Sequence, residues 1–177
     1  MAEFKLDVGA LVTHRPEAGD LVFCHSRGLI ARAIRVAQRM RSDSKDAHWN
    51  HVAILDRLEN GDWYVIQAEG KGVTQSRRLK DIAPHGQMQI ATLPATVSRK
   101  RVLDFVRSQV SDPYGFLTIL SIALDFILPQ RIAIRKSGTW VCSALVGGAL
   151  WYGGYPKAMT WPDLYQVTPA DLYGALG

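Results

Sequence analysis

Residues 51–70, HVAILDRLENGDWYVIQAEG, constrain the fold of this chain more than any other stretch. Two runs rich in β-branched, aliphatic and aromatic residues flank Asn60 and Gly61. An Asn-Gly pair between such runs is the strongest short-range signal of a β-hairpin, because both residues tolerate positive φ. Residues 19–26 and 87–94 also have the composition of strands. The sequence therefore predicts a small antiparallel sheet built around this hairpin.

Helical patterns are largely segregated from these strands. In residues 27–41 apolar side chains recur at helical spacing and arginines fill the other face. Residues 98–110 form an amphipathic pattern with Ser98 as N-cap, and Thr168 before Pro169 marks the start of a short C-terminal helix. Further helices are expected at 116–128 and 142–152. This segregation predicts an α+β fold in which the sheet packs against helices.

The bulk composition is that of one globular domain. With 177 residues, 47% of them hydrophobic, the chain can bury a substantial core. We expect a single domain over residues 1–177, with 1–18 as a loose N-terminal arm. The most apolar run, 116–128, is interrupted by Asp125 and is shorter than the roughly 20 residues of a membrane span. No basic segment followed by an apolar core begins the chain, so we expect it to be cytoplasmic as synthesised, with export by a leaderless route left open.

Metal sites and nucleic-acid binding are not indicated. Cys24 and Cys142 lie far apart without CxxC spacing, and the five histidines lack the spacing of metal ligands. A disulfide between the two cysteines remains formally open. The formal net charge is +5, and much of it comes from the arginines of 27–41. That helix face is either simply solvated or makes weak contact with an anionic surface, such as a membrane or a wall polymer. No nucleic-acid-binding motif accompanies it.

Cys142 and His51 could carry chemistry together. Cys142 lies where an irregular segment gives way to the helix 142–152, and the free N–H groups at a helix start favour thiolate over thiol. His51 begins a strand and could take the thiol proton and later deliver it to a leaving group. Gln67 and Glu69, on the next strand, could hold the imidazole ring. A second interpretation stays open, in which Cys142 is an inert thiol of the core.

Five motifs occur in an order that resembles a known family. They are GDLVFCHS, WNHVAIL, VIQAEGKGV, DPYG and WVCSALV. In this order they resemble the circularly permuted, YiiX-type branch of the NlpC-type papain-like cysteine peptidases and amidases, from about Gly19 to the VTPADLY tail. The resemblance implies a permuted papain-like fold with Cys142 as the nucleophile at a helix N-terminus and His51 as the general base. Tyr114 and Trp140 match positions near the substrate cleft of the family, and a packing role stays equally open for both.

The third catalytic position departs from the family's pattern. This branch usually has glutamate where the chain has Gln67. A glutamine can accept a hydrogen bond from the imidazole but cannot stabilise imidazolium as a carboxylate would. Glu69 lies two residues further on the same strand face and could substitute for it.

The resemblance implies an amide or peptide hydrolase that works through a thioester acyl-enzyme and needs no cofactor. The implied substrates are small peptide amides such as those of bacterial peptidoglycan. A lipid acyltransferase or thioesterase of the same fold is one alternative, which the basic helix 27–41 and the apolar run 116–128 would suit. A binding or structural module that has lost catalysis is another, and Gln67 is the feature that favours it.

The hairpin register decides whether these residues can meet. A tight two-residue loop at Asn60-Gly61 would place residue 52 opposite Glu69 and residue 54 opposite Gln67. His51 would then point to the other face, because side chains alternate along a strand. We therefore predict a wider or bulged loop, which shifts the register by one and puts His51 on the face of Gln67 and Glu69.

Overall fold

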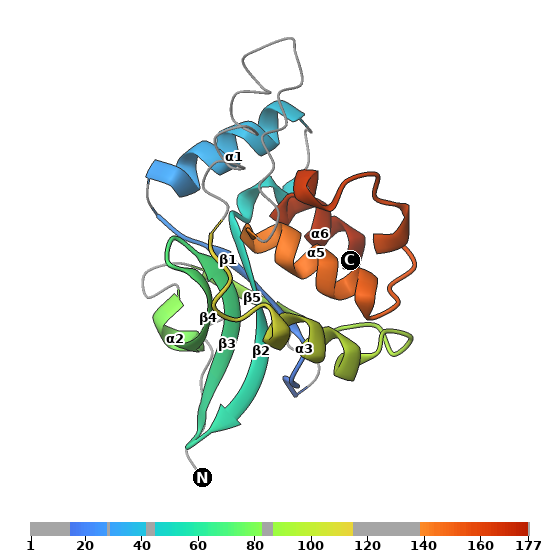
Figure 1. The fold of residues 1–177 in the computed structure, drawn as a ribbon. Coiled ribbons are helices and arrows are strands. Elements are labelled where there is room, and N and C mark those ends of the chain that lie inside the picture. The colour runs from blue at the N-terminus through green and yellow to red at the C-terminus, as the bar shows by residue number, and fades with distance from the viewer. Residues whose placement is uncertain (1–14, 28, 42–44, 83–86, 115–138, 177) are drawn as a thin grey trace.

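The sheet of the computed structural model is antiparallel, with strands in the spatial order β4-β3-β2-β1-β5 (Figure 1). The structure describes residues 15–27, 29–41, 45–82, 87–114 and 139–176. Within these, the strands are β1 Leu21–His25, β2 His51–Glu59, β3 Asp62–Glu69, β4 Gly72–Arg78 and β5 Gln87–Ala91. The described α-helices are α1 Leu29–Arg41, α2 Leu79–Ile82, α3 Arg99–Ser108, α5 Cys142–Tyr152 and α6 Pro169–Leu176. Short 3-10 helices are η1 Lys45–His48, η2 Ala158–Thr160 and η3 Leu164–Gln166.

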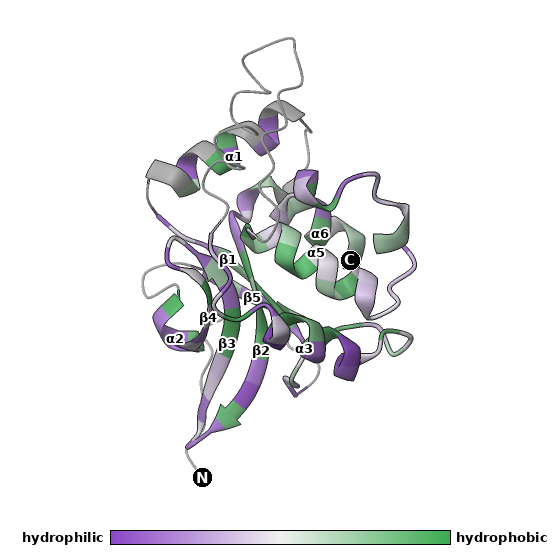
Figure 2. Cartoon of the chain, viewed as in Figure 1, coloured by the Kyte–Doolittle hydropathy of each residue, from purple (hydrophilic) through white to green (hydrophobic). Residues whose placement is uncertain are grey.

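Helices α3, α5 and α6 cover one face of the sheet (Figure 1). This face carries the larger core cluster, in which residues of β1, β2 and β3 meet residues of these helices; its members include Leu21, Phe23, Val52, Ile54, Ile66, Val102, Val106, Leu145, Leu150 and Leu172. Helix α5 is predominantly hydrophobic and its residues 142–150 are all buried (Figure 2). It is therefore the central helix of the layer.

The opposite face of the sheet has a smaller apolar cluster. Val22, Cys24, Ala53 and Leu55 of β1 and β2 pack there with Leu79 of α2. Because both faces of β1 and β2 are buried, their sequences are continuous apolar runs and do not alternate between apolar and polar residues. Gln38 attaches α1: its Nε2 donates to Trp49 O at 2.8 Å, and its Oε1 accepts from Ala170 N at 3.1 Å.

Most of the predicted elements are confirmed. The hairpin, the strands near 21–25 and 87–91, and the helices α1, α3, α5 and α6 lie where the sequence patterns place them. Ser98 Oγ caps α3 by accepting from Arg101 N at 3.4 Å. Thr168 and Asp171 cap α6, since Thr168 N donates to the Asp171 carboxylate and Asp171 N to Thr168 Oγ1. The strand β4 and the short helix α2 were not predicted.

Two expectations fall wholly or partly outside the described residues. The helix predicted at 116–128 lies entirely outside them, as does the predicted N-terminal arm up to residue 14. The end of that arm is attached: Glu17 N donates to Asp20 Oδ2 at 2.9 Å, and Arg99 Nη1 lies 2.7 Å from Asp20 Oδ1. Among the described helices, none has the length and apolar character needed to cross a membrane.

The hairpin loop differs from the prediction. Glu59 pairs directly with Asp62, so the loop is the strict two-residue turn, and Asn60 and Gly61 have φ of 51° and 82°. The wider loop that we expected is therefore wrong. The register nevertheless shifts by one further along the strands, between Leu55 and Arg57, where Asp56 forms a bulge.

Beyond the bulge, Leu55 pairs with Val65 and Ile54 with Ile66. Continued to the start of β2, this register places His51 opposite Glu69, on the face that also holds Gln67. The shared face that the chemistry requires is thus present, and a strand bulge rather than the loop produces it.

Candidate active site

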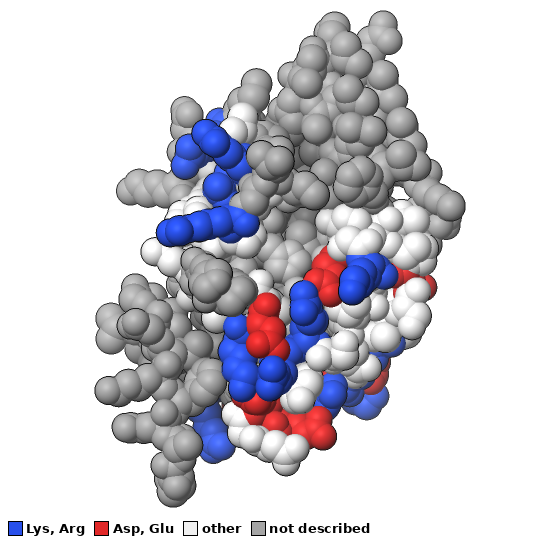
Figure 3. Space-filling view, turned by 90° about the vertical axis from the view of Figure 1, so that its left-hand side faces the viewer, with Lys and Arg blue, Asp and Glu red and all other residues white. Residues whose placement is uncertain are grey.

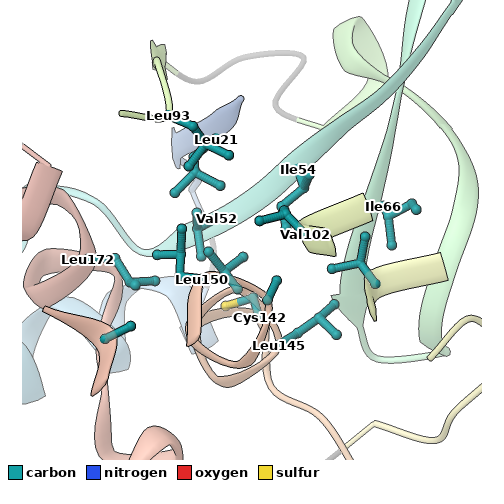
Figure 4. Packing of buried hydrophobic residues seen from close by; sticks show 14 of the residues in the cluster. Leu21, Val52, Ile54, Ile66, Leu93, Val102, Cys142, Leu145, Leu150 and Leu172 are labelled. Carbon is teal, nitrogen blue, oxygen red and sulfur yellow. The ribbon is translucent and has the colours of Figure 1, made fainter. Parts of the chain in front are cut away.

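Cys142 is the first residue of α5 and lies where this helix meets β2. Figure 4 shows it beside Val52 and within the core layer that includes Leu145. Cys142 is buried, with 6% of the residue exposed. Val141, the N-cap, has extended backbone and no capping side chain. Hydrogen bonding from the backbone N–H groups of Ser143, at the helix start, and of Val52 in β2 helps to lower the pKa of Cys142.

His51, the first residue of β2, lies between Cys142 and Gln67. Its Nε2 is 2.7 Å from Gln67 Oε1, and because an amide oxygen can only accept, Nε2 carries the proton of this bond. The ring also interacts with Cys142, whose charge and hydrogen bonding both raise the pKa of His51. The imidazole is therefore held on both sides.

Burial favours the neutral forms of Cys142 and His51, but the interaction between the two residues outweighs it and favours the charged forms. Burial by itself raises the pKa of Cys142, whereas the positive charge and hydrogen bond of His51, with the two backbone N–H groups, lower it; the net direction is down. Burial lowers the pKa of His51, whereas the Cys142 thiolate, its hydrogen bond, Gln67 and the charge of Glu69 raise it; the net direction is up. Both shifts favour a thiolate–imidazolium pair.

Gln67 is 2% exposed and joins His51 to Glu69. Its Nε2 donates to Glu69 Oε2 at 3.3 Å while its Oε1 faces the imidazole. Glu69 in turn contacts β4, with Thr74 Oγ1 at 3.5 Å from Oε1 and Arg77 Nε also at 3.5 Å. Gln67 is thus the group in contact with His51, and Glu69 lies one hydrogen bond further away.

Tyr114 and Trp140, the residues expected beside the substrate, lie next to each other, and Tyr114 is close enough to Cys142 to respond to its charge. They are paired by a parallel β-bridge, and Trp140 N donates to Pro113 O at 3.1 Å. The Trp140 indole N–H donates to Asp112 Oδ2 at 3.0 Å and to Gln109 Oε1 at 3.1 Å. Burial, and then the charge of the nearby Cys142, raise the pKa of Tyr114, so its phenol stays protonated.

Sequence reasoning did not single out Asn50. This residue directly precedes His51, and its side chain attaches the start of β2 to the end of β1. Asn50 Oδ1 accepts from Ser26 Oγ at 2.8 Å and from Ser26 N at 3.2 Å. Asn50 Nδ2 donates to Ser26 O at 3.1 Å, and Asn50 N donates to Cys24 O. The available signal in the sequence was an asparagine directly before a histidine that begins a strand.

Cys24 and His48 lie near the site in other environments. Cys24 is fully buried, and burial, with a smaller effect of the Cys142 charge, raises its pKa to about 12. Both cysteines are free thiols. His48 stacks on His25, with ring centroids 4.0 Å apart, and its Nε2 lies 2.7 Å from Gln87 Oε1. Cys24 pairs with His51 along the backbone of β1 and β2, but among the described residues no hydrogen bond joins the side chain of Cys24 or of His48 to the side chains of Cys142 and His51.

Comparison with known proteins agrees with this geometry. The family model of the permuted papain-like amidases, YaeF/YiiX, C92 family, matches residues 15–121, which is more than half of the chain. The chain belongs to this family. The matched residues include His51, Gln67, Glu69 and Tyr114, whereas Cys142 lies beyond them. The family expected from the five motifs is confirmed. None of the curated proteins compared with the chain matches it.

A solved structure has the same fold. The crystal structure of metalloprotein yiiX from Escherichia coli O157:H7 aligns with a TM-score of 0.53 at 22% identity, over 78% of this chain and 66% of that one. The chain thus spans just under two thirds of that protein's length, and at this identity the similarity shows the fold alone. In the part of the present chain that the structure describes, no three His, Cys, Asp or Glu side chains come together as a metal site.

Proposed function

We propose that this member of the amidase family is a cysteine hydrolase that cleaves amide bonds through Cys142. The observation that carries the proposal is the hydrogen-bonded series from Cys142 through His51 to Gln67 at the start of α5. The thiolate attacks the carbonyl carbon of the substrate, and the imidazolium of His51 donates its proton to the leaving amine. A thioester acyl-enzyme remains. A water molecule then attacks it while His51 takes the proton, which returns the thiolate–imidazolium pair.

The oxyanion formed in each step needs hydrogen-bond donors. The backbone N–H of Cys142 is at the first position of α5, where such groups have no partner within the helix. The phenol of Tyr114 would be a second donor, since it lies near enough to Cys142 to respond to its charge and is protonated at neutral pH like any tyrosine. Trp140, paired with Tyr114, forms the wall that orients the substrate.

For the substrate we propose peptide amides of the kind found in peptidoglycan. The amide chemistry of the family supports the bond type, and the resemblance to NlpC-type hydrolases supports the cell-wall class. The test is digestion of purified peptidoglycan by the intact protein, with Cys142→Ala as control and mass spectrometry of the released fragments. A product that depends on Cys142 supports the proposal. Digests identical for both proteins contradict it.

One observation favours lipid acyl chemistry as a second candidate. On α1, Val36 is half exposed between the exposed side chains of Arg32 and Arg39. Figure 3 shows Lys and Arg side chains at the level of this helix with no described acidic side chain beside them. Such a surface suits weak contact with an anionic membrane. Release of fatty acid from anionic phospholipid vesicles by the wild type, but not by Cys142→Ala, would favour this candidate over peptidoglycan.

A further inference from the structure

The amide of Gln67 can face His51 in two ways, and only one of them supports catalysis. With Oε1 toward the ring, the amide accepts the Nε2 proton and stabilises imidazolium. With the NH2 group toward the ring, two donors would face each other when His51 is charged, and the imidazolium would lose its partner. A neutral third residue therefore needs something that fixes its orientation.

Glu69 supplies that constraint. A carboxylate can only accept hydrogen bonds, so it holds the NH2 group of Gln67, 3.3 Å away, on its own side. This leaves Oε1 of Gln67 at 2.7 Å from His51 Nε2. Reversing the amide would break both hydrogen bonds inside a nearly closed site, because Gln67 is buried.

Glu69 is itself fixed and charged. Arg77 and Thr74 of β4 contact its Oε1, and three-quarters of its side chain is buried. Its negative charge also acts on His51 directly through space and raises the pKa of the ring. Among the described residues, Cys142 of α5 is the other charged group that acts on His51, while Cys24, the register partner of His51 on β1, is a neutral thiol.

We propose that Glu69 is a positioning residue that acts through Gln67, so that the neutral amide and the carboxylate together do what one glutamate does at the third position of related sites. This inference rests on the proposed function. It implies that Glu69 supports the charge on His51, and through His51 the thiolate of Cys142, without touching either of them.

Glu69→Gln tests the inference without a known substrate. The variant keeps the shape of the side chain but removes its charge and lets it donate as well as accept. We expect the alkylation of Cys142 by iodoacetamide at pH 6 to slow by about tenfold, because weaker support of the imidazolium raises the pKa of the thiol and lowers the thiolate fraction. At pH 9 an ordinary thiol also ionises, so the two rates should converge. A merely structural defect would lower both rates.

Two further variants serve as controls. Glu59→Gln removes a carboxylate that is paired with an arginine at the far end of the hairpin, 3.2 Å from Arg57, and should leave the alkylation profile unchanged. Gln67→Glu places a carboxylate directly at His51, so adding Glu69→Gln to this variant should cost little. Thermal unfolding of each variant checks that the fold is retained.

The outcomes separate this inference from the proposed function. Two results would show that Glu69 has no positioning role while leaving the hydrolase proposal intact. In the first, Cys142 is activated in the wild type and Glu69→Gln has the same pH profile of alkylation. In the second, Glu69→Gln slows the alkylation as much in the Gln67→Glu protein as in the wild type. If the profiles change as expected but no amide is cleaved, the proposed function fails and the role of Glu69 stands.

Discussion

At the scale of single residues, the two cysteines show how surroundings decide reactivity. The main effect on the pKa of Cys24, in the middle of the sheet, is burial, which raises it to about 12. Cys142 is almost as buried, yet His51 and two backbone N–H groups lower its pKa. The sequence indicated this difference through the helix start at Cys142 and the strand histidine, because both are local signals. It could not show the distance between them.

Substitutions at Gln67 test the third position. Gln67→Ala removes the partner of His51 Nε2, and a hydrogen bond to a charged group is worth about 1.5–3 kcal/mol, or about ten- to hundredfold in rate. Glu69→Ala should cost less, since it leaves that bond in place. Gln67→Glu should retain or raise activity, because a carboxylate stabilises imidazolium better than an amide. The measurement is kcat/KM on the fragment-releasing substrate. A larger loss for Glu69→Ala than for Gln67→Ala would contradict this assignment.

Tyr114→Phe tests the phenol as an oxyanion donor. The change removes one hydroxyl from a residue that otherwise packs against the core. Loss of one such donor lowers kcat by about a hundredfold, whereas KM should change little, because the donor acts on the transition state. Alkylation of Cys142 should be unaffected. Unchanged kcat would leave Tyr114 with a packing role alone.

At the scale of elements, the bulge at Asp56 brings the site together. Asp56 is 1% exposed, and its carboxylate accepts from Arg57 of β2, Gln75 of β4 and Arg107 of α3 at 2.9–3.0 Å. These partners hold the extra residue in β2, which sets the register that puts His51 and Gln67 on one face. The sequence predicted that the register must shift by one but not where. Two of the partners that hold Asp56, Gln75 and Arg107, are 19 and 51 residues away in the chain.

Other elements show the same limit of local patterns. The start of α5 and the hairpin were predictable, since an apolar run after an irregular, Gly-containing segment indicates the helix and an Asn-Gly turn indicates the hairpin. The strand β4, GVTQSRR, is largely polar and lies at an edge of the sheet, so it lacks an apolar pattern. It forms because β3 pairs with it, and because its Val73 N donates to Asp112 O at 2.9 Å.

Asp56→Ala should therefore lower both stability and activity. It leaves two arginines and an amide without their shared acceptor, and we expect a loss of about 2–3 kcal/mol in the free energy of unfolding. Cys142 alkylation at pH 6 should slow as well, because the register is less well fixed. Chemical denaturation measures the first effect. A variant that is as stable as the wild type would show that the bulge forms without this carboxylate.

The same residue gives a pH dependence with a defined sign. Burial raises the pKa of Asp56, but the hydrogen bonds from Gln75, Arg107 and Arg57 and the charge of Arg107 outweigh it, so the pKa is lowered in the folded protein. A lowered carboxylate pKa stabilises the fold above the ordinary value near 3.9, and this stability is lost as the pH falls through the folded pKa. When the free energy of unfolding is measured at decreasing pH, Asp56→Asn should not show the part of the loss that comes from protonation of this carboxylate.

At the scale of the whole molecule, the site lies at a junction rather than inside one element. The proposed nucleophile, Cys142, comes from the helical layer, the histidine and its partners from the sheet, and Tyr114 from the segment after α3. The core clusters on the two faces of the sheet are formed by other residues, apart from Cys142. Residues selected for reactivity at such a junction are seldom optimal for stability.

Cys142→Ser and His51→Ala should accordingly abolish turnover while changing the free energy of unfolding little. In each variant the remaining partner can gain or lose a proton and become neutral, so that no unpaired charge stays buried. Thermal unfolding next to the activity assay makes the comparison. If both variants unfolded several kcal/mol more easily and no turnover were found in the wild type, Cys142 would be a core thiol.

The measurement that tests the central claim most directly is the alkylation of the two cysteines by iodoacetamide at pH 6 in the folded protein, read by mass spectrometry. The thiolate–imidazolium pair exists above the lowered pKa of Cys142 and below the raised pKa of His51, whereas an ordinary thiol, with a pKa near 8.5, is almost fully protonated at pH 6. The account predicts rapid labelling of Cys142, none of Cys24, and slower labelling in His51→Ala. Equal labelling of both cysteines, or a rate unaffected by the loss of His51, would contradict it.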